Sequence, residues 1–192
     1  LLYDFFRKDM NDYQTHGGDL NKVDYYFFQR NKSHVTLRGD NVKSKGEKYI
    51  ADYLFEHDIR YIYEPLVNLN NIERSGIGNS VYKPDFIIFS GDKKYYLEHW
   101  GIDEKDDYKK VPSEWLQGKN EKEVWQKYVN EIQWKRNLWK NRNQVLLETN
   151  ITQLANGRSN FENVLKHILN KHNIIHFKLQ NKEIINKVVN AN

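Results

Sequence analysis

Hydrophobic residues in the middle of the chain form two short runs separated by a polar turn. Residues 82–89 and 95–100 are rich in aromatic and branched side chains, and residues 90–94 form a polar, glycine-containing loop of hairpin length. The pattern predicts two paired β-strands. Each strand carries one carboxylate among apolar neighbours, Asp85 in the first and Glu98 in the second.

Apolar residues at helical spacing predict helices on both sides of this hairpin. Ser44 followed by Glu47 resembles a capping box, and the apolar positions after it continue at helical spacing to Phe55. The first helix is therefore expected to begin after Ser44. Later helices are predicted over residues 121–141, 161–169 and 183–189.

Shorter apolar segments predict further strands. They cover residues 61–66, 144–149 and 174–179, whereas residues 68–80 are rich in Asn, Ser and Gly and predict a loop. The order helix, strand, hairpin, helix, strand, helix is typical of an α/β domain. We therefore expect a mixed β-sheet flanked by helices.

The N-terminal residues 1–36 differ from the rest of the chain. They are polar and aromatic with weak periodicity, which fits either a segment that docks on a neighbouring domain or a poorly defined terminus. The second segment, residues 37–192, is expected to form the folded domain with a C-terminal helix–strand–helix. Because the chain begins at Leu1 rather than Met, we expect it to be part of a larger protein.

Composition narrows the function classes. The chain has no Cys among its 192 residues, which excludes disulfides and thiolate metal sites and favours a cytoplasmic location. No apolar run approaches the roughly 18 residues that a membrane span needs. The net charge of +4 permits binding to nucleic acid without arguing for it alone.

The two strand carboxylates suggest a divalent-cation site. Strand alternation places Glu98 and Trp100 on one face of the second strand and His99 on the other. If Asp85 faces the same side as Glu98, their oxygens can converge on one cation, and oxygen ligands favour Mg²⁺ or Mn²⁺ over Zn²⁺. Such an ion can promote phosphodiester hydrolysis. Glu47 could add a ligand from the first helix, or it could merely cap that helix.

Several segments together are similar to the PD-(D/E)XK nuclease superfamily, and more narrowly to the nuclease-like domain of bacterial superfamily-1 (UvrD/Rep-type) DNA helicases. They are residues 37–48, Tyr63-Glu64, Tyr82-Lys83-Pro84-Asp85-Phe86 and residues 96–103. The resemblance implies a restriction-endonuclease-like fold and Mg²⁺-dependent (or Mn²⁺-dependent) cleavage of DNA. It also implies helicase (ATPase) domains elsewhere in the same chain, within a DNA repair or defence protein.

The resemblance also implies roles for individual residues. Asp85 and Glu98 would be metal ligands, the His99 carbonyl a further one, and Glu47 would complete the acidic set. Residues expected to contact DNA are Lys45, Lys83, Tyr128, Lys135 and Arg136.

The family pattern has a lysine two residues after the second acid, and this chain has Trp100 there. In variants of the superfamily that lysine can come from a neighbouring helix. Lys135 is our candidate, with Lys127 behind it, because helical spacing places Tyr128 and Lys135 two turns apart on one face. The alternative is that Lys135 is a solvated surface residue or a phosphate contact.

Two other functions stay open. A catalytically inactive module that kept the fold would bind DNA through basic residues such as Lys135, Arg136 and Arg142. A protein-interaction domain would instead dock on a partner through residues 1–36. Of the tryptophans on the long helix, we expect Trp125 and Trp139 to belong to the core.

Overall fold

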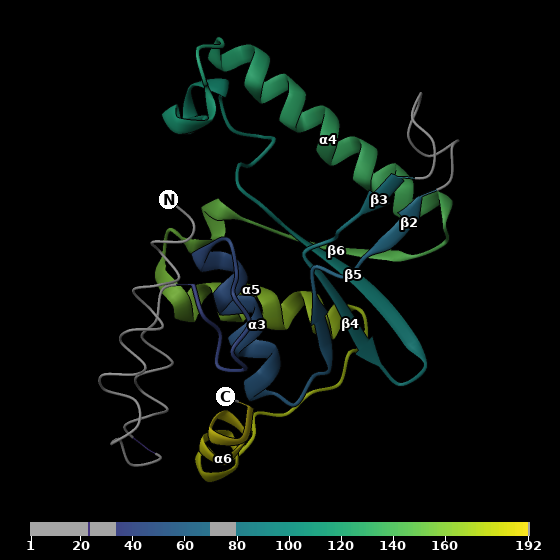
Figure 1. Cartoon of the computed structure of the whole chain (residues 1–192), viewed down its shortest axis with the longest axis vertical. Helices are drawn as coiled ribbons and strands as arrows, with labels where there is room; N and C mark the ends of the chain where they lie inside the picture. Colours follow the sequence, from purple (N-terminus) through teal and green to yellow (C-terminus); the bar gives the residue numbers. More distant parts are fainter. Residues whose placement is uncertain (1–22, 24–33, 70–79, 192) are drawn as a thin grey trace. The chain divides into compact units, whose positions relative to one another are not determined.

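The structure is a computed structural model that describes Val23, residues 34–69 and residues 80–191 (Figure 1). The chain divides into two compact units, Leu1–Ile59 with His176–Asn192, and Arg60–Ile175. The predicted N-terminal docking segment, residues 1–36, lies almost wholly outside the described residues.

The unit Arg60–Ile175 contains a four-stranded mixed sheet, so the expected α/β class is confirmed. The strand order is β1 (Tyr61–Tyr63), β4 (Phe86–Ser90), β5 (Lys93–Trp100) and β6 (Val145–Asn150). The pairs β1–β4 and β4–β5 are antiparallel, whereas β5–β6 is parallel. This mixed arrangement matches the prediction from the order of elements.

The predicted hairpin is β4–β5. Phe86 pairs with Leu97 and Ser90 with Lys93, so only Gly91 and Asp92 form the turn. The loop is shorter than predicted, because Ser90, Lys93 and Lys94 continue the strands. Asp85 lies one residue before β4, and extending the register by one residue places it opposite Glu98.

Two helices contact opposite faces of this sheet. Helix α4 (Glu121–Asn141) has the predicted bounds, and its Trp139 stacks on Tyr96 of β5 at 3.6 Å between ring centroids. Helix α5 (Gly157–Lys171) contacts the other face, where Phe161 meets His99 edge-on at 5.7 Å. Alternation along β5 therefore assigns its even-numbered side chains to α4 and its odd-numbered ones to α5.

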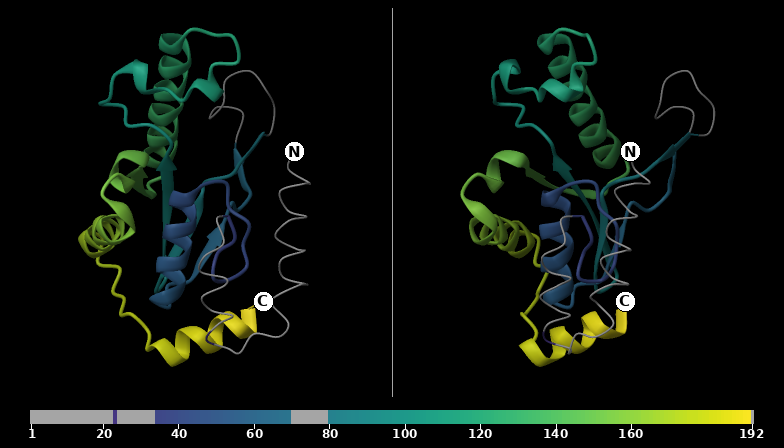
Figure 2. Two further views of the ribbon diagram at one scale, coloured as in Figure 1. Left: turned by 90° about the vertical axis from the view of Figure 1, so that its left-hand side faces the viewer. Right: turned by 60° about the vertical axis from the view of Figure 1, so that its left-hand side comes forward.

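The connection from β5 to α4 contains two short 3-10 helices, η2 (Tyr108–Lys110) and η3 (Ser113–Trp115). It lies beside the N-terminal part of α4 (Figure 2). Trp115 stacks on Tyr128 of α4 at 5.2 Å, and the Tyr128 hydroxyl accepts a hydrogen bond from Gly101 N–H at 2.8 Å. These contacts fasten α4 to the end of β5.

The loop predicted over residues 68–80 is too long at both ends, because residues 68, 69 and 80 belong to strands. Strands β2 (Val67–Leu69) and β3 (Ser80–Tyr82) form an antiparallel pair around the undescribed residues 70–79. Each strand has only three residues, too few to show a clear alternation. Their stability comes from packing, since Leu69 and Tyr82 share a buried cluster with Leu138 and Trp139 of α4.

The unit Leu1–Ile59 with His176–Asn192 contains α3 (Lys45–Glu56) and α6 (Asn181–Ala191). Ser44 caps α3 as predicted, because its hydroxyl accepts from Glu47 N–H at 3.1 Å. A buried ion pair joins Lys48 to Asp52 at 3.0 Å.

The predicted strand over residues 174–179 is wrong. This segment is irregular and pairs with no strand among the described residues, and its alternate side chains Ile175 and Phe177 are exposed. Two hydrogen bonds tie it to α3, one from Leu179 N–H to the Glu56 carbonyl and one between His176 Nε2 and the Tyr53 hydroxyl. None of the helices in the described part of the chain is long and apolar enough to cross a membrane.

Candidate functional site

Glu98 is a buried carboxylate with two side-chain partners. It is only 1% exposed, and its Oε2 lies 2.8 Å from Lys135 Nζ, while Oε1 accepts a hydrogen bond from the Tyr82 hydroxyl. Burial raises the pKa of Glu98, and the Lys135 charge and both hydrogen bonds act against that rise. Lys135 therefore favours the ionised form of Glu98, whereas burial favours the neutral form.

Lys135 occupies a half-enclosed position above two aromatic rings. Its side chain is 18% exposed, and Nζ lies 5.0 Å from the ring centroid of Trp100 and 5.4 Å from that of Tyr82. Trp100 follows Glu98 on the same face of β5, so its ring contributes a surface on which Lys135 rests. The structure thus brings Lys135, but not Lys127, to Glu98: Lys127 is exposed on α4.

Asp85 lies close to the same group. Its Oδ2 accepts a hydrogen bond from the His99 N–H at 2.7 Å, which fixes the carboxylate beside β5. The Tyr82 pKa is raised by burial, then by the charge of Glu98, and also by that of Asp85. Burial likewise raises the pKa of Tyr128 to about 12, with smaller contributions from Asp85 and Glu98. Both carboxylates therefore act on the same two hydroxyl groups.

His99 takes part through its backbone. Its side chain points away from Glu98, as alternation predicted, and Nδ1 lies 2.9 Å from Thr149 Oγ1 beneath α5. Burial lowers the pKa of His99 to about 4, so the ring is neutral near pH 7. The role of its carbonyl as a metal ligand stays a prediction.

Glu47 belongs to the other compact unit. It is buried, and its carboxylate accepts hydrogen bonds from Lys43 N–H at 3.0 Å and from the Ser44 hydroxyl at 2.9 Å. These bonds are those of a residue that stabilises the start of α3. Its place in the acidic set stays a prediction.

The residues predicted to contact DNA fall into two groups. Lys45 and Lys83 are exposed, whereas Tyr128 is partly buried between Gly101 and Trp115. Arg136 is bound by two carboxylates, with ion pairs to Glu104 at 2.7 Å and to Glu148 at 2.8 Å. Its side chain is therefore occupied within the protein.

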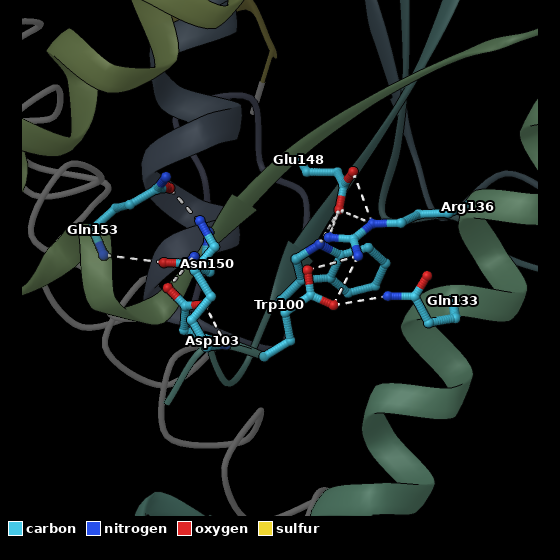
Figure 3. Close-up of polar contacts among 9 residues, drawn as sticks. Trp100, Asp103, Gln133, Arg136, Glu148, Asn150 and Gln153 are labelled. Atoms are coloured by element: carbon cyan, nitrogen blue, oxygen red, sulfur yellow. Dashed lines mark hydrogen bonds and ion pairs between the residues drawn. The ribbon is translucent and has the colours of Figure 1, made fainter. Parts of the chain in front are cut away.

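Figure 3 shows Arg136 of α4 against Glu148 of β6, with Trp100 beside them. The Trp100 indole donates to Glu148 Oε2 at 2.8 Å, and Gln133 donates to Glu104 at 2.9 Å. Helix α4 is thus fixed to the sheet one residue beyond Lys135. We did not single out Glu148 or Glu104 from the sequence, because charged residues in a short strand or a loop usually face solvent.

A second polar cluster in Figure 3 lies at the C-terminal ends of β5 and β6. Asn150 donates to Asp103 Oδ2 at 3.1 Å, and its backbone N–H donates to Gln153 Oε1 at 3.0 Å. Asn150 and Gln153 form a capping box for η4 (Ile151–Leu154). The cluster orders the loops that follow the two parallel strands.

In the unit Arg60–Ile175 the candidate metal site has two of the three predicted carboxylates, Asp85 and Glu98. Within the described part of the chain, no three His, Cys, Asp or Glu side chains form a group that could hold a metal ion. Asp85 and Glu98 still supply the oxygen donors that suit Mg²⁺, which is usually bound by one or two carboxylates together with substrate phosphates. The two residues match that ion by ligand type, and Mg²⁺ binding stays a prediction.

Comparisons with protein-family models, with curated proteins and with solved structures gave no match.

Proposed function

We propose that this chain is a Mg²⁺-dependent DNA nuclease domain with Asp85, Glu98 and Lys135 at its active site. The observation that carries the proposal is the 2.8 Å contact between Lys135 Nζ and the buried Glu98. It supplies a lysine beside the second acid although the strand position holds Trp100. A restriction-endonuclease-like fold and a helicase-associated parent protein, in DNA repair or defence, belong to the same proposal.

Asp85 and Glu98 would hold the metal ion, which would polarise the scissile phosphate and activate a water for attack. Lys135 offsets negative charge as it builds up on the phosphate and orients the attacking water. Tyr82 holds Glu98 through the second carboxylate oxygen. The backbone N–H of His99 holds Asp85 in place.

The proposal is tested by incubating end-labelled single- and double-stranded DNA with the protein in Mg²⁺, Mn²⁺ or EDTA. We expect metal-dependent cleavage that falls at least about a hundredfold in Asp85→Asn. Lys127→Met, an exposed lysine on α4, is the matched control for Lys135→Met and should cleave like wild type. Cleavage that survives Asp85→Asn would refute the assigned site.

A second candidate function is a nuclease-fold module that binds DNA without cutting it. It is favoured by the closed hydrogen bonding of Glu98, whose two oxygens already contact Lys135 and Tyr82. That arrangement would also suit a purely structural ion pair. If the protein cleaves DNA with neither metal but still binds DNA in gel shifts, this second function is established instead.

A further inference from the structure

A surface pocket lies at the end of β5 opposite to Glu98. Its volume is about 620 Å³, and it is formed by three turns of the unit Arg60–Ile175: the β4–β5 turn, the α4–β6 turn and the end of α5. Its lining includes Lys93, Lys94, Asn143, Lys171, His172 and Asn173. We call it the lysine pocket.

The lysine pocket carries an excess of positive charge. The described lining contains three lysines, Lys93, Lys94 and Lys171, and one carboxylate, Asp92. Over residues 34–69 and 80–191 the structure gives none of these three lysines a carboxylate partner. By contrast, Arg136, Lys135 and Lys110 of the same unit each have at least one. The three lysines come from two separate segments, so the charge is gathered by the fold rather than by a run in the sequence.

Two similar turns form the floor of the pocket. Helices α4 and α5 each end two residues before an Asn in the left-handed region, Asn143 with φ 53° and Asn173 with φ 56°. Such turns use backbone N–H groups to satisfy the last helical carbonyls. Gln144 N–H reaches the Trp139 carbonyl and Ile174 N–H the Leu169 carbonyl, both near 3 Å. These bonds weaken the negative potential that helix C-termini would otherwise present to an anion.

The wall next to α5 is also held in place. The Tyr95 hydroxyl donates to the His172 carbonyl at 3.2 Å, and the two rings meet edge-on at 6.2 Å. Asn143, Gln144 and Asn173 add amide groups that can donate to an oxyanion. The pocket therefore combines exposed ammonium charges with amide donors.

We propose that the lysine pocket binds a phosphate group. Lysine ammonium groups bind phosphate as point charges, and amide donors complete its hydrogen bonding. The phosphate could belong to a nucleic-acid backbone or to a small phosphorylated compound. The site is separate from Asp85 and Glu98, about 17 Å away along β5 by strand geometry, and it does not depend on cleavage.

The test is titration of the isotopically labelled full chain with inorganic phosphate and, separately, with a short single-stranded DNA in EDTA. Amide resonances of Lys93, Tyr95, Asn143 and Asn173 should shift and saturate. Lys171→Gln should weaken binding by roughly three- to tenfold, the loss of one charged contact at an exposed site. Lys166→Gln, an exposed lysine on α5 outside the pocket, is the matched control and should bind like wild type.

The two probes separate the possible sources of the phosphate. If Lys171→Gln weakens the binding of both probes, the pocket binds the nucleic-acid backbone. If it weakens the binding of inorganic phosphate alone, the ligand is a small phosphorylated compound. Lack of saturable binding by either probe would overturn the proposal. So would equal affinities of Lys171→Gln and Lys166→Gln. Because both lysines are exposed, each variant is expected to fold, and far-ultraviolet circular dichroism would check this.

Discussion

Glu98 illustrates how burial changes the role of a charged residue. A carboxylate that is 1% exposed is costly unless a cation and hydrogen-bond donors accompany it, and Lys135 and Tyr82 provide both. The same ion pair can serve stability and catalysis. Measurements of folding and of cleavage are therefore needed on the same variants.

We expect Lys135→Met to lower the free energy of unfolding by about 3 kcal/mol, because it leaves the Glu98 charge buried without its cation. The double variant Lys135→Met/Glu98→Gln should recover most of that loss, since the neutral amide needs no cation. Urea unfolding in EDTA measures both. Equal stabilities of the single variant and wild type would show that the ion pair contributes nothing to folding.

His99 makes stability depend on pH. The unfolded chain binds a proton at this residue below about 6.5, whereas the folded chain binds it only below about 4. The His99 contribution is therefore complete above pH 6.5, and it falls by about 3 kcal/mol as the pH drops to 4.

The check is urea unfolding in EDTA between pH 4 and pH 8. His99→Gln should flatten the decline relative to wild type, whereas His167→Gln on the exposed face of α5 should leave it unchanged. An identical pH profile for His99→Gln and wild type would contradict the inferred burial effect.

The sequence predicts Asp85, Glu98 and Lys135 as site residues; the structure pairs Lys135 with Glu98 and holds Asp85 against the backbone of His99. Sequence reasoning did not find Tyr82 as a partner of Glu98, since a tyrosine beside Lys83-Pro84 carries no signal of its own. It also placed Arg136 among the DNA contacts. Side-chain pairs across separate elements, such as Arg136 with Glu104 and Glu148, are set by tertiary packing and leave no periodic signal.

At the scale of elements, prediction was best where periodicity was long. Helix α4 has 21 residues and begins at an Asn120 cap, so its bounds agree with those predicted. Strands β2 and β3 were missed because three residues cannot display a period of two. The segment 174–179 was assigned to a strand from its branched residues, but a strand also needs a partner, and nothing in the local sequence reveals one.

The space beside Gly101 is too small for a side chain. A Cβ at Gly101 would lie 2.6 Å from Trp115 Cη2, and Trp115 stacks on Tyr128. We expect Gly101→Ala to lower the free energy of unfolding by about 1–2 kcal/mol, because the Trp115 ring must move.

Thermal and urea unfolding would measure this cost. In a Trp115→Leu background the same Gly101→Ala change should cost less, since the shorter side chain leaves room for the Cβ. Equal costs in both backgrounds would place the strain elsewhere than at Trp115.

At the scale of the whole molecule, the chain passes from one compact unit into the other and back. Residues on both sides of Arg60–Ile175 build the unit that contains α3 and Glu47. The four-stranded sheet, with Asp85, Glu98 and the lysine pocket, lies within Arg60–Ile175. Of the three predicted acids, Glu47 alone belongs to the other unit, so its role needs a test of its own.

Glu47→Gln is the decisive change. If Glu47 acts in catalysis, the variant should cleave DNA at least about tenfold more slowly than wild type, because a carboxylate charge near the metal is lost. It should also lose about 1 kcal/mol of stability through the weaker start of α3.

Ser44→Ala is the matched control, because it removes the Ser44 hydroxyl that caps α3 and keeps the Glu47 carboxylate. Cleavage rates and urea unfolding measured on both variants separate the two roles. If Glu47→Gln loses cleavage activity and Ser44→Ala does not, Glu47 takes part in catalysis. If the two variants lose stability equally and keep full activity, Glu47 acts only as a helix cap.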